Sequence, residues 1–191
     1  MSTDNQISTD TPISESSTRL VDFLETSNLH KKDFAEMIGV TLSYVYSLID
    51  STISFSTRTT TLERIAVIMG INPSEFPEYK SSEEPKLVDP GVQFLKQKQR
   101  ELGLSNVQLL KRFPRQKRLE MVDLWRGAEP LPLDWNDLAA VAEVLELSSK
   151  DIYPYWQARL QQYLVVGGID LFANTGLINA MFEGAKSYLK I

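Results

Sequence analysis

Twenty residues, KKDFAEMIGVTLSYVYSLID at positions 31–50, decide the fold of this chain. Apolar side chains recur at helical spacing on both sides of Gly39, and the chain has almost none of the apolar-polar alternation that marks a half-buried strand. We therefore expect one helix near 31–38 that Gly39 closes, and a second near 42–50 that Thr41 caps with its hydroxyl.

The same pattern occurs a second time further along the chain. The apolar stripe in TTLERIAVIMGINPSEF, at 60–76, matches WNDLAAVAEVLELSSKDIY, at 135–153, at an offset of 76 residues. Upstream the offset is 75 residues, as between Phe34 and Leu109, and an insertion of one residue near Pro114 explains the difference. An internal repeat of this kind predicts two domains of the same fold.

The repeat and two polar breaks divide the chain into segments. Residues 1–17 hold Ser, Thr and Asp with almost no large apolar group, so we expect a disordered tail there. Residues 80–90 carry two prolines among small and charged residues, and we expect a linker. The remaining segments are a first domain at 18–79, a second domain at 91–155 and a C-terminal helical element at 156–191.

The expected fold class is all-α, with two tandem five-helix domains followed by the C-terminal element. The other helices of the first domain are expected near 18–27, 60–69 and 73–78. In the second domain the helices are expected near 91–102, 106–113, 116–126, 135–145 and 149–155. The offset of 76 also pairs positions around the last helix of each domain: Asn72 with Ser148, and Glu75 with Asp151.

Composition argues against most kinds of enzyme. The chain has no cysteine, which excludes disulfides, thiolate zinc sites and cysteine nucleophiles. Its one histidine, His30, has no second metal ligand or orienting partner nearby, and we interpret it as a solvated residue at a helix start. We expect no catalytic activity, no metal and no cofactor. No apolar stretch is long enough to span a bilayer, so we expect a cytoplasmic protein without a membrane partner.

Positive charge is concentrated in one part of the chain although the formal net charge is -5. Residues 94–127 contain only three acidic residues but nine basic ones, which are Lys96, Lys98, Arg100, Lys111, Arg112, Arg115, Lys117, Arg118 and Arg126. Phosphate binding requires only one basic face, so an acidic total does not exclude a nucleic-acid partner.

The stretches at 31–50 and 60–76 resemble the helix-turn-helix domain of the lambda-repressor and Xre-like family. The features that carry the resemblance are the Phe34-Ala35 pair, the Gly39-Val40 turn, the Thr41 cap, the apolar Val45 and Leu48, a later Leu-x-x-Ile-Ala run and a terminal Pro-x-x-Phe. The second domain is similar, with apolar Met121 and Leu124. It departs from the pattern in two places, since Leu110 replaces a small residue and Pro114-Arg115 replaces the glycine turn.

The resemblance implies that the third helix of each domain enters the DNA major groove while the start of the second helix lies against phosphate. Ser105 and Asn106 would hold that phosphate position in the second domain. The candidate DNA contacts of the second domain are Lys111, Arg112, Arg115, Gln116, Lys117, Arg118 and Arg126. Those of the first domain are Lys31, Lys32, Ser43, Tyr44 and Ser47. Because the third helix of the first domain has no basic residue, we place the main DNA surface on the second domain.

Two functions remain open at this stage. The leading one is a transcriptional regulator that binds double-stranded DNA, and the alternative is a protein-interaction scaffold that keeps the helix-turn-helix fold with little or no DNA binding. A protein partner on the first domain fits either. Tyr44 could stack on bases or pack within the domain, whereas we expect Tyr46 to pack on a neighbouring helix.

The C-terminal element carries an apolar stripe that is too rich for a lone surface helix. Residues 156–191 are expected to form two helices around Gly167-Gly168, and the second has Leu177, Ile178, Met181, Phe182, Tyr188 and Leu189 on its stripe. We expect these residues to form a homodimer. Packing of the same stripe on the second domain of its own chain is the alternative.

Overall fold

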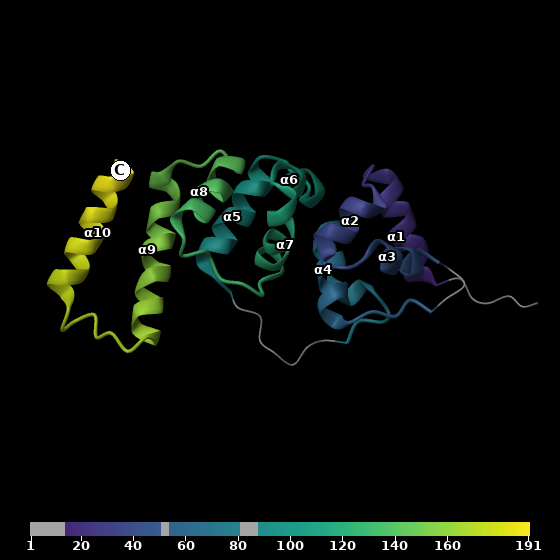
Figure 1. Ribbon diagram of the computed structural model, residues 1–191, viewed down its shortest axis with the longest axis horizontal. Helices are drawn as coiled ribbons and strands as arrows, with labels where there is room; N and C mark the ends of the chain where they lie inside the picture. The colour runs from purple at the N-terminus through teal and green to yellow at the C-terminus, as the bar shows by residue number, and fades with distance from the viewer. Residues whose placement is uncertain (1–13, 51–53, 81–87) are drawn as a thin grey trace, which may run out of the picture. The chain divides into compact units, whose positions relative to one another are not determined.

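The computed structural model describes residues 14–50, 54–80 and 88–191. All regular secondary structure in these residues is helical, which confirms the all-α class (Figure 1). The chain forms two compact units, Met1–Glu83 and Glu84–Ile191, and the division falls inside the segment expected to be a linker. Within the described residues, none of the helices is long and apolar enough to cross a membrane.

The first unit contains four α-helices and a short 3-10 turn among its described residues. They are α1 (Glu15–Thr26), α2 (Lys31–Ile38), α3 (Leu42–Ile49), α4 (Thr59–Met69) and η1 (Pro73–Glu75). The core is built by apolar side chains at helical spacing, among them Leu20, Phe34, Val45, Ile65 and Phe76, each of which is fully or almost fully buried. The helix expected at 73–78 is only one turn, because Phe76 precedes Pro77 and adopts the extended conformation that a following proline favours.

The helix α1 begins inside the segment that was expected to be a disordered tail. Ser14 caps it, and both Ser16 and Ser17 are buried. The Ser17 hydroxyl donates to the Leu48 carbonyl over 2.8 Å, and the Ser16 hydroxyl donates to Glu78 over 2.6 Å. The expectation of disorder was therefore wrong for residues 14–17, and the rest of the expected tail lies outside the described residues.

The second unit contains six α-helices and one 3-10 turn among its described residues. They are α5 (Pro90–Glu101), α6 (Asn106–Arg112), η2 (Arg115–Lys117), α7 (Arg118–Arg126), α8 (Trp135–Val144), α9 (Ser149–Val166) and α10 (Thr175–Leu189). Leu95, Leu109, Leu124, Leu138 and Ile152 are buried in its core.

The backbone repeats between the units as the sequence does. The first residue of α5 lies 75 residues after the first residue of α1, and their last residues are separated by the same number. The first residues of α4 and α8 are 76 residues apart. Two left-handed positions repeat as well: Asn28 (φ 46°) with Gly103 (φ 64°), and Gly70 (φ 72°) with Glu146 (φ 57°). The offset changes between the start of α6 and the start of α7, where the inserted residue was expected.

The helix α9 is longer than expected. It continues past residue 155 to Val166, so the C-terminal element begins within a helix of the second unit and not after it. Pro154 removes one main-chain donor from this helix without ending it. Tyr153 is buried beside it, and Trp156 donates from its indole nitrogen to the Leu133 carbonyl over 2.9 Å, so contacts on both sides of the proline support the helix.

Candidate nucleic-acid interface

The connection between α2 and α3 has the geometry that the sequence indicates. Gly39 ends α2 in the left-handed conformation (φ 73°), and the Val40 amide donates back to the Ala35 carbonyl over 3.0 Å. The Thr41 hydroxyl then accepts from the Tyr44 amide over 3.2 Å and begins α3. The expected helix 31–38, its glycine end and the Thr41 cap are all confirmed.

The basic candidates of the first unit lie at the start of α2. Lys31 and Lys32 are the first two residues of this helix, directly after His30, and all three side chains are exposed. The Lys31 ammonium lies 5.9 Å from the centre of the Tyr46 ring, which joins the start of α2 to α3. Positive charge at this end of a helix opposes the helix dipole, and an anion placed there would offset that cost.

On α3, Tyr44 takes the second of the two roles left open for it, packing within the domain, whereas Tyr46 is more exposed than expected. The Tyr44 hydroxyl donates to the Thr57 hydroxyl over 2.8 Å, which holds the half-buried ring within the unit. Tyr46, which was expected to pack on a neighbouring helix, is 54% exposed. Ser43 and Ser47 are exposed as well, and the Ser47 hydroxyl donates to the Tyr44 carbonyl over 2.7 Å. The outward face of α3 therefore carries hydroxyl groups and no charge.

In the second unit, the expected helix 116–126 begins two residues late. Phe113 adopts an extended conformation before Pro114, so α6 ends at Arg112. Gln116 and Lys117 consequently lie in the 3-10 turn η2, and α7 starts at Arg118 without a side-chain cap.

Contacts inside the second unit engage at least four of its seven candidates. Arg112 donates to the Val144 carbonyl over 3.1 Å, and Arg118 donates to the Phe113 carbonyl over 3.1 Å. The other two are in ion pairs: Lys117 lies 2.9 Å from Glu120 and 3.1 Å from Asp137, and Arg126 lies 3.2 Å from Asp123. The hydrogen bonds that the Lys117 ammonium donates to Glu120 and Asp137 raise the pKa of Lys117. Part of the positive charge counted in the sequence is thus offset inside the unit.

The most exposed basic candidates of the second unit lie where α6 leads into η2. Lys111, Arg112, Arg115 and Gln116 are exposed, whereas Lys117, Arg118 and Arg126 are half-buried. We call Lys111, Arg112 and Arg115 the α6–η2 basic segment. It is the part of this unit's candidate set that is best exposed to a phosphate backbone.

The start of α6 was considered a phosphate position, but the unit uses its polar groups internally. Ser105 and Gln108 form a capping box, in which the Ser105 hydroxyl accepts from the Gln108 amide over 3.2 Å and the Gln108 side chain accepts from the Ser105 amide over 2.9 Å. The Asn106 side chain accepts from Gln99 over 2.6 Å. The Ser105, Asn106 and Gln108 side chains at this end of α6 are therefore engaged within the unit.

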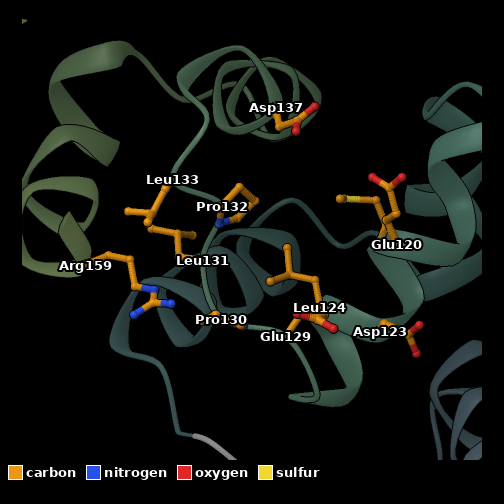
Figure 2. A pocket seen from close by; sticks show the side chains of 11 residues that line it. Glu120, Asp123, Leu124, Glu129, Pro130, Leu131, Pro132, Leu133, Asp137 and Arg159 are labelled. Carbon is orange, nitrogen blue, oxygen red and sulfur yellow. The ribbon is translucent and has the colours of Figure 1, made fainter. Parts of the chain in front are cut away.

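A pocket of about 390 Å³ lies beside α7, and nothing in the sequence indicated it. Figure 2 shows Glu120 and Asp123 on one side of it, Arg159 on the other and Leu131 between them. Its lining comes from α7, α8, α9 and the segment between α7 and α8, so no local motif could reveal it. Lys117 and Arg126 pair with Glu120 and Asp123 of the rim, and the pocket lining carries charges of both signs, with Arg159 among several acids.

The described residues contain no group of three or more His, Asp or Glu side chains placed to hold a metal ion. Comparison of the chain with protein-family models, curated proteins and solved structures gave no match.

Proposed function

We propose that the chain is a DNA-binding transcriptional regulator with two tandem helix-turn-helix domains of the lambda-repressor type, one in each unit. The observation that carries the proposal is the repeated order of elements: each unit holds two short helices joined by a turn of a few residues, between the same flanking helices. In helix-turn-helix proteins the second helix of such a pair enters the major groove and the first contacts phosphate. The proposed recognition helices are therefore α3 and α7.

The second unit supplies the phosphate contacts in this proposal. The α6–η2 basic segment is exposed and precedes α7 directly, so it can reach the backbone that flanks a groove-bound helix. Gln116, which is exposed in η2 just before α7, is the candidate for reading a base, because its amide can both donate to and accept from adenine.

In this proposal the first unit also contacts DNA, through a recognition helix that carries no charged residue. Ser43 and Ser47 face outward on α3, and hydroxyl groups can contact either bases or phosphate. Lys31 and Lys32 stand at the start of α2, where the proposed geometry places a phosphate.

A protein-interaction scaffold is the second candidate, and a specific observation favours it. The ion pairs of Lys117 with Glu120 and Asp137 lower the charge available to DNA. The hydrogen bonds of Arg112 and Arg118 to backbone carbonyls hold both side chains within the second unit, as expected for a face that has been retained for stability alone. The two candidates differ in one measurable property, which is affinity for duplex DNA at low salt.

The test is a titration of a fluorescent random-sequence duplex with the full chain, followed by anisotropy over a range of salt concentrations. The double variant Lys111→Glu/Arg115→Glu should weaken binding on all sequences. It should also flatten the slope of log affinity against log salt by about 0.9 for each phosphate that the chain no longer neutralises. The matched control is Lys150→Glu/Lys190→Glu, which makes the same change of charge at two exposed positions of the same unit.

Loss of binding in the Lys111/Arg115 variant with near wild-type binding in the control supports the proposal. A wild-type chain that binds no duplex at low salt contradicts the proposal and favours the scaffold. Equal losses in both variants mean that net charge, and not this segment, governs binding.

A further inference from the structure

The helix α10 is attached to the second unit by one of its faces. Of the six apolar residues expected to form a dimer, Ile178 and Phe182 are buried within the chain. The Tyr153 hydroxyl donates to the Phe182 carbonyl over 3.0 Å, and the Phe182 ring meets the Trp156 ring edge-on at 6.4 Å. These two residues act as an intramolecular cap, so the expectation that they form a dimer contact was wrong.

The exposed large apolar side chains of the described residues are concentrated on α9, α10 and the segment between them. Eight of the eleven large apolar side chains that are exposed in the described residues lie between Tyr163 and Tyr188. We call these eight the hairpin surface: Tyr163, Val165, Val166, Ile169, Phe172, Leu177, Met181 and Tyr188. Val166, Phe172 and Tyr188 are 87%, 94% and 85% exposed. Figure 1 shows α9 and α10 joined by a loop at one end, so the surface belongs to a helical hairpin.

The charge on this hairpin is compatible with pairing to a copy of itself. Between residues 160 and 188 the only charged residues are Glu183 and Lys186, which pair with each other over 2.9 Å, and Asp170. Its carboxylate accepts from the Phe172 and Ala173 amides over 2.8 and 3.0 Å, so it is used to close the loop. A two-fold contact places a surface against itself, and this surface has almost no like charge to repel.

The area is also sufficient. The eight side chains expose on the order of 1,000 Å², from their exposed fractions and the usual areas of large apolar side chains. A stable protein interface needs about 800 Å² per partner, and the largest apolar patch of a typical monomer covers about 300–600 Å².

We propose that the hairpin surface binds the hairpin surface of a second copy of this chain. The contact joins the α9–α10 hairpins and leaves Ile178 and Phe182 in place within each chain. The inference does not depend on DNA binding, because it rests on exposure, charge and area in the hairpin alone.

The test is sedimentation equilibrium of the full chain, with matched double variants. The wild type should sediment with about twice the 21.7 kDa mass of one chain at concentrations of roughly 10–100 µM. Val166→Lys/Leu177→Lys places four cations in a two-fold contact and should weaken the association at least about tenfold. The control Tyr46→Lys/Val88→Lys introduces the same charge at exposed apolar positions outside the hairpin, and should leave the association unchanged.

Both variant pairs replace exposed side chains, and circular dichroism should show wild-type helix content for each. A wild type with the mass of one chain up to about 100 µM overturns the proposal. Association that survives Val166→Lys/Leu177→Lys also overturns it. A single-chain wild type that floats with phosphatidylcholine vesicles would instead assign the surface to lipid.

Discussion

The ammonium of Lys117 lies 3.1 Å from the carboxylate of Asp137, which ties the turn before α7 to the start of α8. Glu120 holds the same ammonium from the other side at 2.9 Å. A lysine that the sequence presents as a DNA contact is thus shared between two acids of its own unit. Whether DNA competes for it can be measured.

Asp137→Asn should tighten DNA binding, because it releases Lys117 from one of its partners and removes a negative charge near α7. We expect an increase in affinity of roughly twofold to fivefold, the scale of an exposed ion pair. Anisotropy titration at low salt measures it. Glu143→Gln makes the same change of charge on an exposed part of α8 and should change affinity less. An Asp137 variant with wild-type affinity would place Lys117 away from the DNA.

Gln99 should be important for the stability of the second unit. This buried side chain accepts from the Trp125 indole and donates to the Leu104 carbonyl over 3.0 Å. Gln99→Ala leaves the buried indole N–H without that partner and should lower the free energy of unfolding by about 1–3 kcal/mol. Urea denaturation followed by tryptophan fluorescence measures the loss. Gln97→Ala, an exposed position of the same helix, should cost less than about 0.5 kcal/mol.

Asp89 should be a stronger helix cap than an exposed one. One carboxylate oxygen accepts from the Gly91 and Val92 amides over 2.8 and 3.1 Å, while the other accepts from the Leu131 amide over 3.1 Å. Asp89→Ala loses a cap and leaves a buried amide unpaired, so we expect a loss of about 2–4 kcal/mol. The exposed cap Asp134 provides the comparison, and Asp134→Ala should cost about 1 kcal/mol. Equal losses in chemical denaturation would contradict the role of the Leu131 contact.

Two capping carboxylates at equivalent positions of the repeat should make stability fall in acid. A hydrogen bond from the Asn72 backbone, followed by one from Arg19, lowers the pKa of Glu75, and hydrogen bonds from Ser148 lower the pKa of Asp151. A lowered pKa stabilises the fold above the pKa of the unfolded chain, and the contribution is lost as the pH falls through the folded value. The stability gap between wild type and Glu75→Gln/Asp151→Asn should therefore close below about pH 4.

Thermal unfolding at a series of pH values tests this. A gap that stays constant down to acid pH would show that the two carboxylates act through something other than their charge. Glu143→Gln/Glu129→Gln, at exposed positions of the second unit, is the control.

Local patterns predicted much of the fold, and long-range contacts account for what they missed. Gly39, Thr41 and the apolar stripe of α4 act through neighbours in the sequence, so the helices around them could be located. The start of α1 could not, because Ser17 is ordered by the Leu48 carbonyl, 31 residues away.

The candidate site shows even more clearly that local patterns are predictable from sequence and long-range contacts are not. Sequence counts locate positive charge correctly between residues 94 and 127, but not how much of it is already used. Arg112 donates to the Val144 carbonyl, 32 residues later, and Lys117 pairs with Asp137 on another helix. Charge compensation of this kind depends on tertiary structure, and spacing within one helix does not reveal it.

The helix α9 runs unbroken from the core of the second unit to the hairpin surface. Its length and its helical rotation therefore set the position and orientation of the hairpin surface relative to that core. Its 18 residues span about 27 Å, and each residue turns the far end by about 100°. In a dimer formed through that end, the distance and twist between the two second units would follow from the residue count of α9. Inserting one residue after Leu160 would turn the rest of α9 by about 100° relative to Tyr153 and Trp156, so the hairpin could take the new orientation only by losing the contacts of Phe182 with these two residues.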